Sequence, residues 1–346
     1  MKTLTFDEGF QIYLRGGFPL IVVDSIEVDR VTSTLAGLTS AWNKELPATS
    51  ADPWLKDNGY RFMVWDCVNG WRFNGKPISG TESPEKAIAA IMHKDTPPGV
   101  YVMQNFHMLW NDSLMHPIYI QMMRDFAVVA KTSHKHLIIA GPCGPVPQEI
   151  QRQIVMLEFN LPDKATLKEY INSYSKELGF TFKDKEIDSA AEAALGMTLQ
   201  EMEGALCTAI IRTKGKSIDR EIIFDEKAKA VKRSGLLEYV KTDETMDSVG
   251  GLDNLKAWYT KIARAFTDKK KADAYGLPTP KGALILGVSG AGKSLSAKAV
   301  ASLFGVPLFR VDIGKIFGSL VGASEGNTRE LLKLIDAVSP AVFLFD

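Results

Sequence analysis

A glycine-rich segment lies between an apolar run and an amphipathic stretch near the end of the chain. The apolar run, residues 283–286, has the length of a short buried strand, and apolar residues recur at helical spacing from Leu295 to Phe304. The segment between them reads Gly287, Val288, Ser289, Gly290, Ala291, Gly292, Lys293 and Ser294. A strand, a loop of this pattern and a helix, in that order, are typical of a phosphate-binding P-loop. We therefore expect an α/β fold for this part of the chain.

Each residue type in this loop has a physical reason to be there. Glycines let backbone N–H groups turn inward around phosphate, and a helix N-terminus adds a positive dipole end. We expect Lys293 to reach the β- and γ-phosphates of ATP and Ser294 to ligate Mg²⁺. A merely structural turn would instead place a lysine at a helix start, where a cation is unfavourable. The predicted cofactors are ATP and Mg²⁺, and the predicted binding residues of this segment are Gly287, Val288, Ser289, Gly290, Ala291, Gly292, Lys293, Ser294 and Leu295.

The last residues of the chain suggest a second contact to the metal ion. A short apolar run, residues 341–345, is followed by Asp346. This pattern is typical of a Walker B strand, whose aspartate holds Mg²⁺ through water in many P-loop enzymes, although buried strands also end in aspartate for structural reasons. We expect Lys293 and Asp346 to be the catalytic residues, and Ser294 and Asp346 the metal-binding ones. The groups that polarise the attacking water are expected beyond Asp346, so this chain is predicted to bind ATP with little hydrolysis.

The rest of the chain is expected to hold two further domains, since 346 residues are too many for one ordinary core. Residues 1–162 alternate short apolar runs with amphipathic stretches, as in βα units around a parallel sheet, but no glycine-rich loop follows any of the runs. Helical periodicity dominates residues 163–240, which predicts a small helical domain. Residues 241–346 are predicted to form the N-terminal portion of the P-loop domain.

Composition excludes several other classes of protein. The 41 basic and 41 acidic residues cancel, so no overall charge attracts the chain to nucleic acid or an anionic membrane. No apolar run is long enough to span a membrane, and two acids stand where a signal peptide would have its apolar core. The three cysteines and five histidines show no metal-site spacing. We expect a cytoplasmic protein with no membrane partner, and the composition gives no evidence for nucleic acid, although it leaves room for a localised charged patch.

Other segments make the chain resemble the AAA family of ATPases. Residues 249–252, which include Gly250 and Gly251, look like the segment that lies against adenine in that family, and residues 276–282 look like its approach to the P-loop strand. Residues 321–329 are similar to the stretch after the family's pore loop. The first 240 residues more loosely resemble a subgroup first named for a hypothetical chloroplast reading frame. There, a degenerate ATPase-like α/β domain with a helical lid precedes a P-loop domain, which is incomplete in this chain.

The resemblance implies a function and a location. It implies that Gly250 and Gly251 bind the nucleotide, that Gln104 or Asn105 stands where an acid would end the degenerate strand, and that the complete protein forms a homo-oligomeric ring. Such a protein would hydrolyse ATP to remodel a macromolecular partner, in the cytoplasm or, if plastid-encoded, in the plastid stroma. The alternative is a non-hydrolysing scaffold that senses ATP. A small-molecule kinase built on the same loop is a third hypothesis, but it gives residues 250–251 and 322–329 no role.

Overall fold

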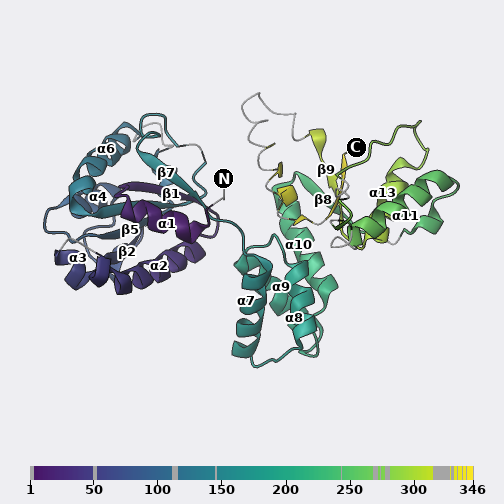
Figure 1. Cartoon of the computed structure of the whole chain (residues 1–346), viewed down its shortest axis with the longest axis horizontal. Coiled ribbons are helices and arrows are strands. Elements are labelled where there is room, and N and C mark those ends of the chain that lie inside the picture. Colours follow the sequence, from purple (N-terminus) through teal and green to yellow (C-terminus); the bar gives the residue numbers. More distant parts are fainter. Residues whose placement is uncertain are drawn as a thin grey trace. The chain divides into compact units, whose positions relative to one another are not determined.

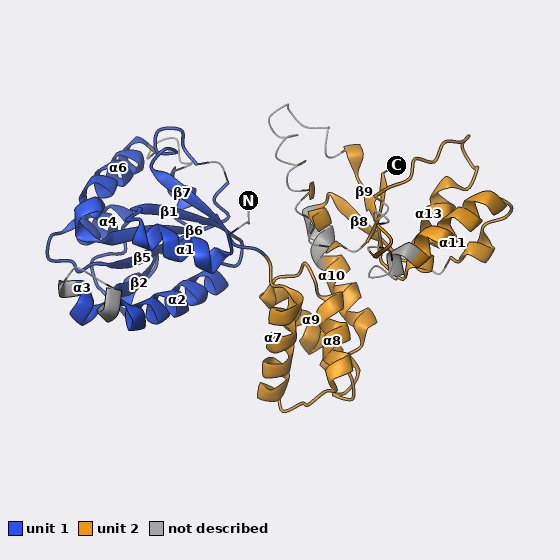
Figure 2. Cartoon of the chain, viewed as in Figure 1, with its two compact units in different colours: residues 1–160 blue, residues 161–346 orange. Residues whose placement is uncertain are grey.

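The computed structural model divides the chain into two units, residues 1–160 and residues 161–346 (Figure 2). Within them it describes the following residues: 4–49, 53–110, 116–144, 146–242, 244–267, 272, 274–276, 281–314, 328, 331–332, 334–336, 338–339 and 341–345. No helix among these residues has both the length and the apolar character that a membrane span requires. Each unit is described below by itself.

A seven-stranded sheet forms the centre of the first unit (Figure 1). Its order is β4-β3-β2-β5-β6-β1-β7, with β2, β5, β6, β1 and β7 parallel and the β2-β3-β4 edge antiparallel. Strands β5, β6 and β1 lie inside the sheet and are buried almost throughout, and each contains an apolar run, as expected of strands covered on both faces. The strands are β1 (Leu20–Asp24), β2 (Arg61–Asp66), β3 (Gly70–Phe73), β4 (Lys76–Pro77), β5 (Gly99–Gln104), β6 (Lys135–Gly141) and β7 (Ile154–Glu158).

Helices cover both faces of this sheet. One apolar core joins the sheet to α1 and α2, and another joins its opposite face to α4 and α6. Successive residues of β1 point to opposite cores: Leu20 and Val22 to one, Ile21 and Val23 to the other. The helices are α1 (Phe6–Arg15), α2 (Val28–Thr49), α3 (Pro53–Asn58), α4 (Pro84–Met92), α5 (His107–Trp110) and α6 (His116–Ser133). The expected α/β class is therefore confirmed.

Four helices open the second unit and share one apolar core. Small residues of α8 and α9, such as Ala190, Ala205 and Ala209, are fully or almost fully buried, so the helix backbones can approach closely. Capping side chains mark where α7 and α9 begin. The helices are α7 (Lys164–Glu177), α8 (Asp184–Ala193), α9 (Leu199–Arg212) and α10 (Arg220–Ser234).

A second sheet follows these helices, in the order β10-β9-β8. Strands β9 (Leu308–Val311) and β10 (Val342–Phe345) are parallel, as the sequence predicts for this part of the chain. Strand β8 (Leu237–Val240) was expected to belong to the helical segment, yet it pairs antiparallel with β9. An ion pair of 2.5 Å between Arg310 and Glu238 crosses this pairing. The helices of this part are η1 (Met246–Ser248), α11 (Asp253–Thr267) and α13 (Lys293–Phe304).

The strand expected at residues 283–286 is not formed. Residues 281–288 are neither helix nor strand, and Leu284 and Leu286 are 86% and 84% exposed. A strand is stable only when neighbouring strands satisfy its backbone groups, and none of the described residues forms a ladder with this segment. The alternation of Leu284, Leu286 and Val288 leaves an exposed apolar edge beside the glycine-rich loop.

One buried lysine in the helical segment predicts a pH dependence of stability. The side chain of Lys227 on α10 is 3% exposed and donates a hydrogen bond to the carbonyl of Leu195. Burial lowers the pKa of Lys227 to about 8, from 10.5 in an exposed position. Between these values the unfolded chain binds more protons than the folded chain, so this lysine makes the folded state more stable as the pH rises. Its destabilising effect is complete below about pH 8 and disappears above about pH 10.5.

We therefore expect Lys227→Met to remove this dependence. Between pH 7.5 and pH 10, the free energy of unfolding of the native chain should rise by about 2–3 kcal/mol relative to that of the variant. The size follows because one pKa unit corresponds to about 1.4 kcal/mol. Urea denaturation of both proteins across this range measures the difference. The control is Lys229→Met, which removes an exposed lysine of the same helix. Parallel pH profiles for native chain and Lys227→Met would refute the assignment.

Candidate nucleotide-binding site

The glycine-rich loop turns on two residues in the left-handed region of backbone space. Gly290 has φ of 81° and Gly292 has φ of 79°. A side chain at such a position clashes with its own backbone, which explains why glycine is needed at both. Between them, Ala291 donates a backbone hydrogen bond of 3.3 Å to the carbonyl of Val288. The chain thus makes a tight turn and enters α13 directly at Lys293.

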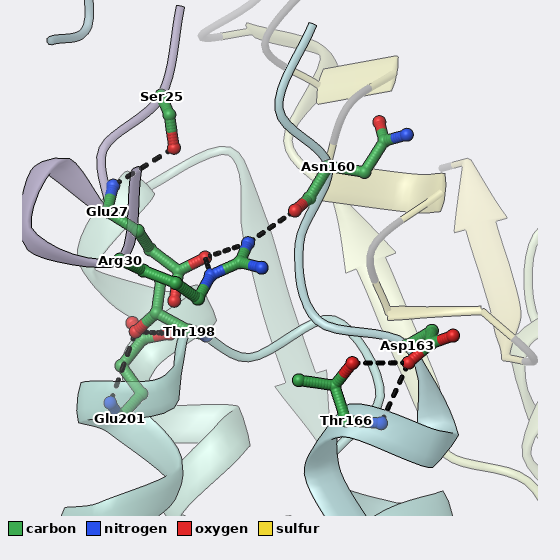
Figure 3. A network of polar contacts seen from close by, with 8 residues as sticks. All are labelled: Ser25, Glu27, Arg30, Asn160, Asp163, Thr166, Thr198 and Glu201. Carbon is green, nitrogen blue, oxygen red and sulfur yellow. Dashed lines mark hydrogen bonds and ion pairs between the residues drawn. The ribbon is translucent and has the colours of Figure 1, made fainter. Parts of the chain in front are cut away.

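Helix α13 begins without a capping side chain. Its N-cap is Gly292, and no acidic residue stands in its first turn. By contrast, Asp163 accepts hydrogen bonds from the backbone and hydroxyl of Thr166 at the start of α7, and Thr198 and Glu201 cap each other's backbone at the start of α9 (Figure 3). Free N–H groups and the dipole make an uncapped helix start an anion site.

Lys293 folds back over the loop. Its Nζ donates hydrogen bonds of 3.0 Å and 2.9 Å to the carbonyls of Gly287 and Val288. The next residue, Ser294, is exposed, and its hydroxyl makes no hydrogen bond to another described residue. The amine and the hydroxyl therefore lie together at the helix start, the amine held by weak carbonyl acceptors that an anionic ligand can replace.

A cavity of about 580 Å³ adjoins the loop. Lys293 and Ser296 of α13 and Ala291 of the loop line one part of it, while residues of α11 and its approach line another. No carboxylate is among the lining residues, and the volume is within the range of small-molecule sites. The remaining lining residues are Leu252, Leu255, Trp258, Tyr259, Gly282, Ala283, Leu284, Ile285 and Leu286.

The predicted residues Gly250 and Gly251 come immediately before Leu252, which lines the cavity. Gly251 has φ of 62°, and the following Leu252 has φ of 55°, so two consecutive residues are left-handed. Leu252 also accepts the first hydrogen bond of α11, from the N–H of Lys256, and is thus its N-cap. Neither glycine lines the cavity; the turn they make brings Leu252 to it.

Other predicted positions lie outside the described residues. Asp346 is one of them, as are residues 277–280 of the approach to the loop and residues 321–327 and 329 of the segment compared with the pore-loop region. The strand that leads to Asp346, β10, is described and pairs in parallel with β9, Val342 opposite Leu308. Helix α13 packs against both strands. The metal-binding role of Asp346 therefore remains a prediction.

The first unit has a different arrangement after its strand β1. Only Ser25, Ile26 and Glu27 lie between β1 and α2. The Ser25 hydroxyl accepts the N–H of Glu27, and the Glu27 carboxylate binds Arg30 at 2.5 Å (Figure 3). Arg30 donates in turn to the carbonyl of Asn160. The start of α2 is thus closed by its own side chains, with a carboxylate where an anion would otherwise bind.

The neighbouring strand ends are also internally satisfied. Asp24, the last residue of β1, accepts a hydrogen bond of 3.0 Å from the N–H of Cys143. Gln104, one of the two residues expected where an acid would stand, ends β5 and donates to the hydroxyl of Thr32. The absence of a nucleotide loop from this sheet stays a prediction.

The residues of the second unit fit ATP and Mg²⁺. The uncapped start of α13 and the Lys293 amine are suited to a polyphosphate, and the free Ser294 hydroxyl is an oxygen ligand of the kind that Mg²⁺ prefers. Among the described residues no group of three or more histidine, cysteine and carboxylate side chains could hold a metal ion on its own. Mg²⁺ would therefore bind here with the phosphates rather than in a protein cage.

Comparison with known families agrees with this division of the chain. Residues 6–159 match the N-terminal domain of SpoVK-like AAA ATPases, and residues 164–234 match the second domain of the same proteins. Residues 283–346 match the ATPase family associated with various cellular activities, AAA. Over most of its length, in three successive segments, the chain is therefore similar to AAA-type ATPases.

Within that class, the chain is similar along almost its whole length to proteins named ycf46. It is 30% identical to the uncharacterized AAA domain-containing protein ycf46 of Trieres chinensis and 26% identical to that of Guillardia theta, in each case over 99% of this chain. It spans 65% and 64% of the lengths of these relatives. A shorter similarity, 35% over 106 residues, links 31% of the chain to 16% of the ATP-dependent zinc metalloprotease FTSH 6, chloroplastic, of Oryza sativa.

The sequence indicates residues 249–252 but does not indicate Leu255, Trp258 and Tyr259, which also line the cavity. Leu252, Leu255 and Tyr259 recur at helical spacing, which predicts only a helix with a buried face. Trp258 is next to that face and is 44% exposed. Nothing in the local pattern indicates that this face meets the loop, because the two are about 30 residues apart in sequence.

The glycine geometry predicts how one substitution will act. Gly292→Ala should cost about 1–2 kcal/mol of stability because alanine is strained at φ of 79°, and it should weaken ATP binding by about tenfold or more by distorting the loop. Gly305→Ala is the matched control, since Gly305 has φ of 67° at the other end of α13 and space for a Cβ. Urea denaturation and calorimetric titration with ATP measure the two effects. Equal ATP affinities for the two variants would contradict the prediction.

Proposed function

We propose that the chain binds ATP with Mg²⁺ at the start of α13. The observation that carries this proposal is the helix start itself: Gly292 provides no cap, Gly290 and Gly292 make the turn that only glycine tolerates, and Lys293 is bent over the loop. The family of the chain supports the same assignment.

The residues of the site would each contact a different part of the bound ATP and Mg²⁺. Backbone N–H groups of residues 290–295 would surround the β-phosphate, and Lys293 would exchange its two carbonyl contacts for phosphate oxygens. Ser294 would supply an oxygen to Mg²⁺, which neutralises the charge that develops between the phosphates. Asp346 would hold the same ion through water. Gly250 and Gly251 would lie along the base.

We further propose that the whole protein hydrolyses ATP and uses the energy to remodel a macromolecular partner, as a homo-oligomeric ring in the cytoplasm or, if plastid-encoded, in the plastid stroma. Support comes from the family and from the similarity to FTSH 6, which is named as ATP-dependent. The chain spans about two thirds of its ycf46 relatives, and we expect the water-activating groups in the portion beyond Asp346.

Lys293→Ala tests the binding proposal. It removes the amine at the loop, so ATP with Mg²⁺ should no longer raise the unfolding temperature of the chain, whereas it should raise that of the native chain. Lys298→Ala, on the same helix and outside the loop, is the control and should retain the shift. An unchanged shift in Lys293→Ala would refute the role of the loop. In the full-length protein, the same substitution should abolish ATP turnover.

Ser294→Ala tests the metal contact separately. With Mg²⁺ present, the variant should bind ATP about tenfold more weakly, because one oxygen ligand of the ion is lost. With EDTA present, the variant and the native chain should bind ATP equally. Titration calorimetry under both conditions gives the comparison, and a loss of affinity that is the same with and without Mg²⁺ would argue against a metal-binding Ser294.

A second function is supported by the first unit. Because the start of α2 is closed by Ser25, Glu27 and Arg30, that unit is suited to a structural or partner-binding role, and the chain could act as an ATP-sensing scaffold that does not hydrolyse ATP. Steady-state turnover separates the two functions. ATP binding without turnover in the full-length protein would favour the scaffold, and ordinary turnover that depends on Lys293 would exclude it.

A further inference from the structure

A second cavity, of about 710 Å³, lies in the first unit between α2 and the β2-β3 edge of the sheet. We call it the α2 groove. Residues of β2, β3 and the turn after β3 form one of its sides. The other side is one face of α2, where small or polar residues recur at helical spacing: Asp29, Thr32, Ser33, Ala36, Thr39, Ser40 and Asn43.

The groove exists because the α2 side of the sheet is covered only in part. Phe62 and Val64 of β2 point to this side and are partly exposed, and Arg72 of β3 stands opposite Val64 in the ladder. Among the described residues, none of β3 belongs to the apolar core that joins the sheet to α1 and α2. On the other face of β3, Trp71 is buried. The groove therefore has a partly apolar floor with a guanidinium beside it.

Arg72 brings an unsatisfied hydrogen-bond donor to the groove. Its Nη2 pairs with Asp66 at 2.9 Å, but its Nε is buried and has no partner among the described residues. A buried donor without a partner costs free energy, so a ligand that supplies an acceptor here gains affinity. A carboxylate is well suited, because hydrogen bonds between a guanidinium and an ionised acceptor are about twice as strong as neutral ones.

The groove is long enough for a stretch of extended polypeptide. Near one end Gln104 donates a hydrogen bond of 3.1 Å to Thr32, and near the other the Asn43 side chain exchanges two hydrogen bonds with the backbone of Tyr60. The part of α2 from Thr32 to Asn43 rises by about 16 Å. About five residues of extended chain cover this distance, whereas a single small anion would fill only a part of it.

The distribution of charge favours an acidic ligand. Arg61 also lines the groove; its guanidinium lies 4.6 Å from the centre of the Phe73 ring and forms no ion pair with another described residue. Among the described residues that line the groove, Asp29 is the only acid, and it lies in the first turn of α2, at the end away from Arg61. The side formed by β2 and β3 is therefore the cationic one.

We propose that the α2 groove binds an extended acidic segment of a partner protein. An aspartate or glutamate of the segment would pair with Arg72, and an apolar side chain next to it would cover Phe62 and Val64. The hydroxyls of Ser33 and Ser40, which form no hydrogen bond with another described residue, would bind the backbone of the segment. This inference rests on the proposed binding of a macromolecular partner, and it names the surface and the chemistry of that partner.

Peptide selection tests the groove with a defined probe. Random peptides of about eight residues, long enough to span the groove, are displayed on phage and selected on the native chain. The selected sequences should contain aspartate or glutamate next to an apolar residue more often than the starting library does. A selection that yields no binding peptides, or peptides without an excess of acidic residues, would overturn the inference.

Variants locate the binding of the selected peptides, measured by fluorescence anisotropy. Arg72→Met should bind them about tenfold more weakly, because the charge-assisted contact is lost. Ser40→Trp, which fills the groove from an exposed position of α2, should show a similar loss and tests the inference even if Arg72→Met fails to fold. The controls are Arg15→Met, an arginine outside the groove, and Ala41→Trp, at the next exposed position of the helix. Affinities in Arg72→Met and Ser40→Trp equal to that of the native chain would refute the inference.

The ATP-induced rise in unfolding temperature, measured on the same variants, separates this inference from the ATP site. The rise should be unchanged in Arg72→Met and Ser40→Trp. If it is, and both variants bind the peptides as the native chain does, the groove is refuted while the ATP site stands. If ATP has no effect on the native chain but Arg72→Met loses peptide binding, the ATP site fails and the groove stands. Citrate that binds as tightly as the peptides, with the same dependence on Arg72, would make the groove a small-anion site and overturn the inference.

Discussion

The start of α13 is the constraint on which the candidate site depends. A helix whose first N–H groups lack a capping side chain must satisfy them otherwise, and here the preceding glycines leave them open rather than covering them. The two left-handed glycines turn the chain directly into α13, and Lys293, the first residue of the helix, bends back over this turn. Positive dipole, amine and hydroxyl converge there without a carboxylate among the residues lining the adjoining cavity.

Two helix starts of the chain, those of α2 and α13, satisfy their first N–H groups in opposite ways. After β1, the helix start carries Ser25, Glu27 and Arg30, whose hydrogen bonds and ion pair complete one another. Before α13, Gly290 and Gly292 have no side chains, so no side-chain hydrogen bond caps the start of the helix. The two helix starts therefore differ in their side chains: polar groups close the start of α2, and glycine leaves the start of α13 without a capping side chain.

Much of this arrangement could be predicted from the sequence, and the exceptions have physical causes. Apolar runs indicate the buried strands β1 and β6 and also the partly exposed β10, and the spacing of its residues indicates the glycine-rich loop. The segment at residues 283–286 has the same apolar character, yet it is not a strand, because a strand requires partners that local sequence cannot specify. Trp258 was missed for a related reason: its place in the cavity depends on contact between α11 and the loop, and neither element encodes that contact alone.

Strand β8 has a practical consequence for dividing the chain. It continues directly from α10, yet its hydrogen bonds go to β9, where Tyr239 packs at 5.7 Å from Phe309. A fragment that begins after residue 240, where the composition changes to a polar linker, would lack β8. Strand β9 would then lose its antiparallel neighbour, and the buried Phe309 ring would become exposed. A fragment that contains the glycine-rich loop should therefore begin at or before Leu236, so that it includes the edge strand β8 together with β9.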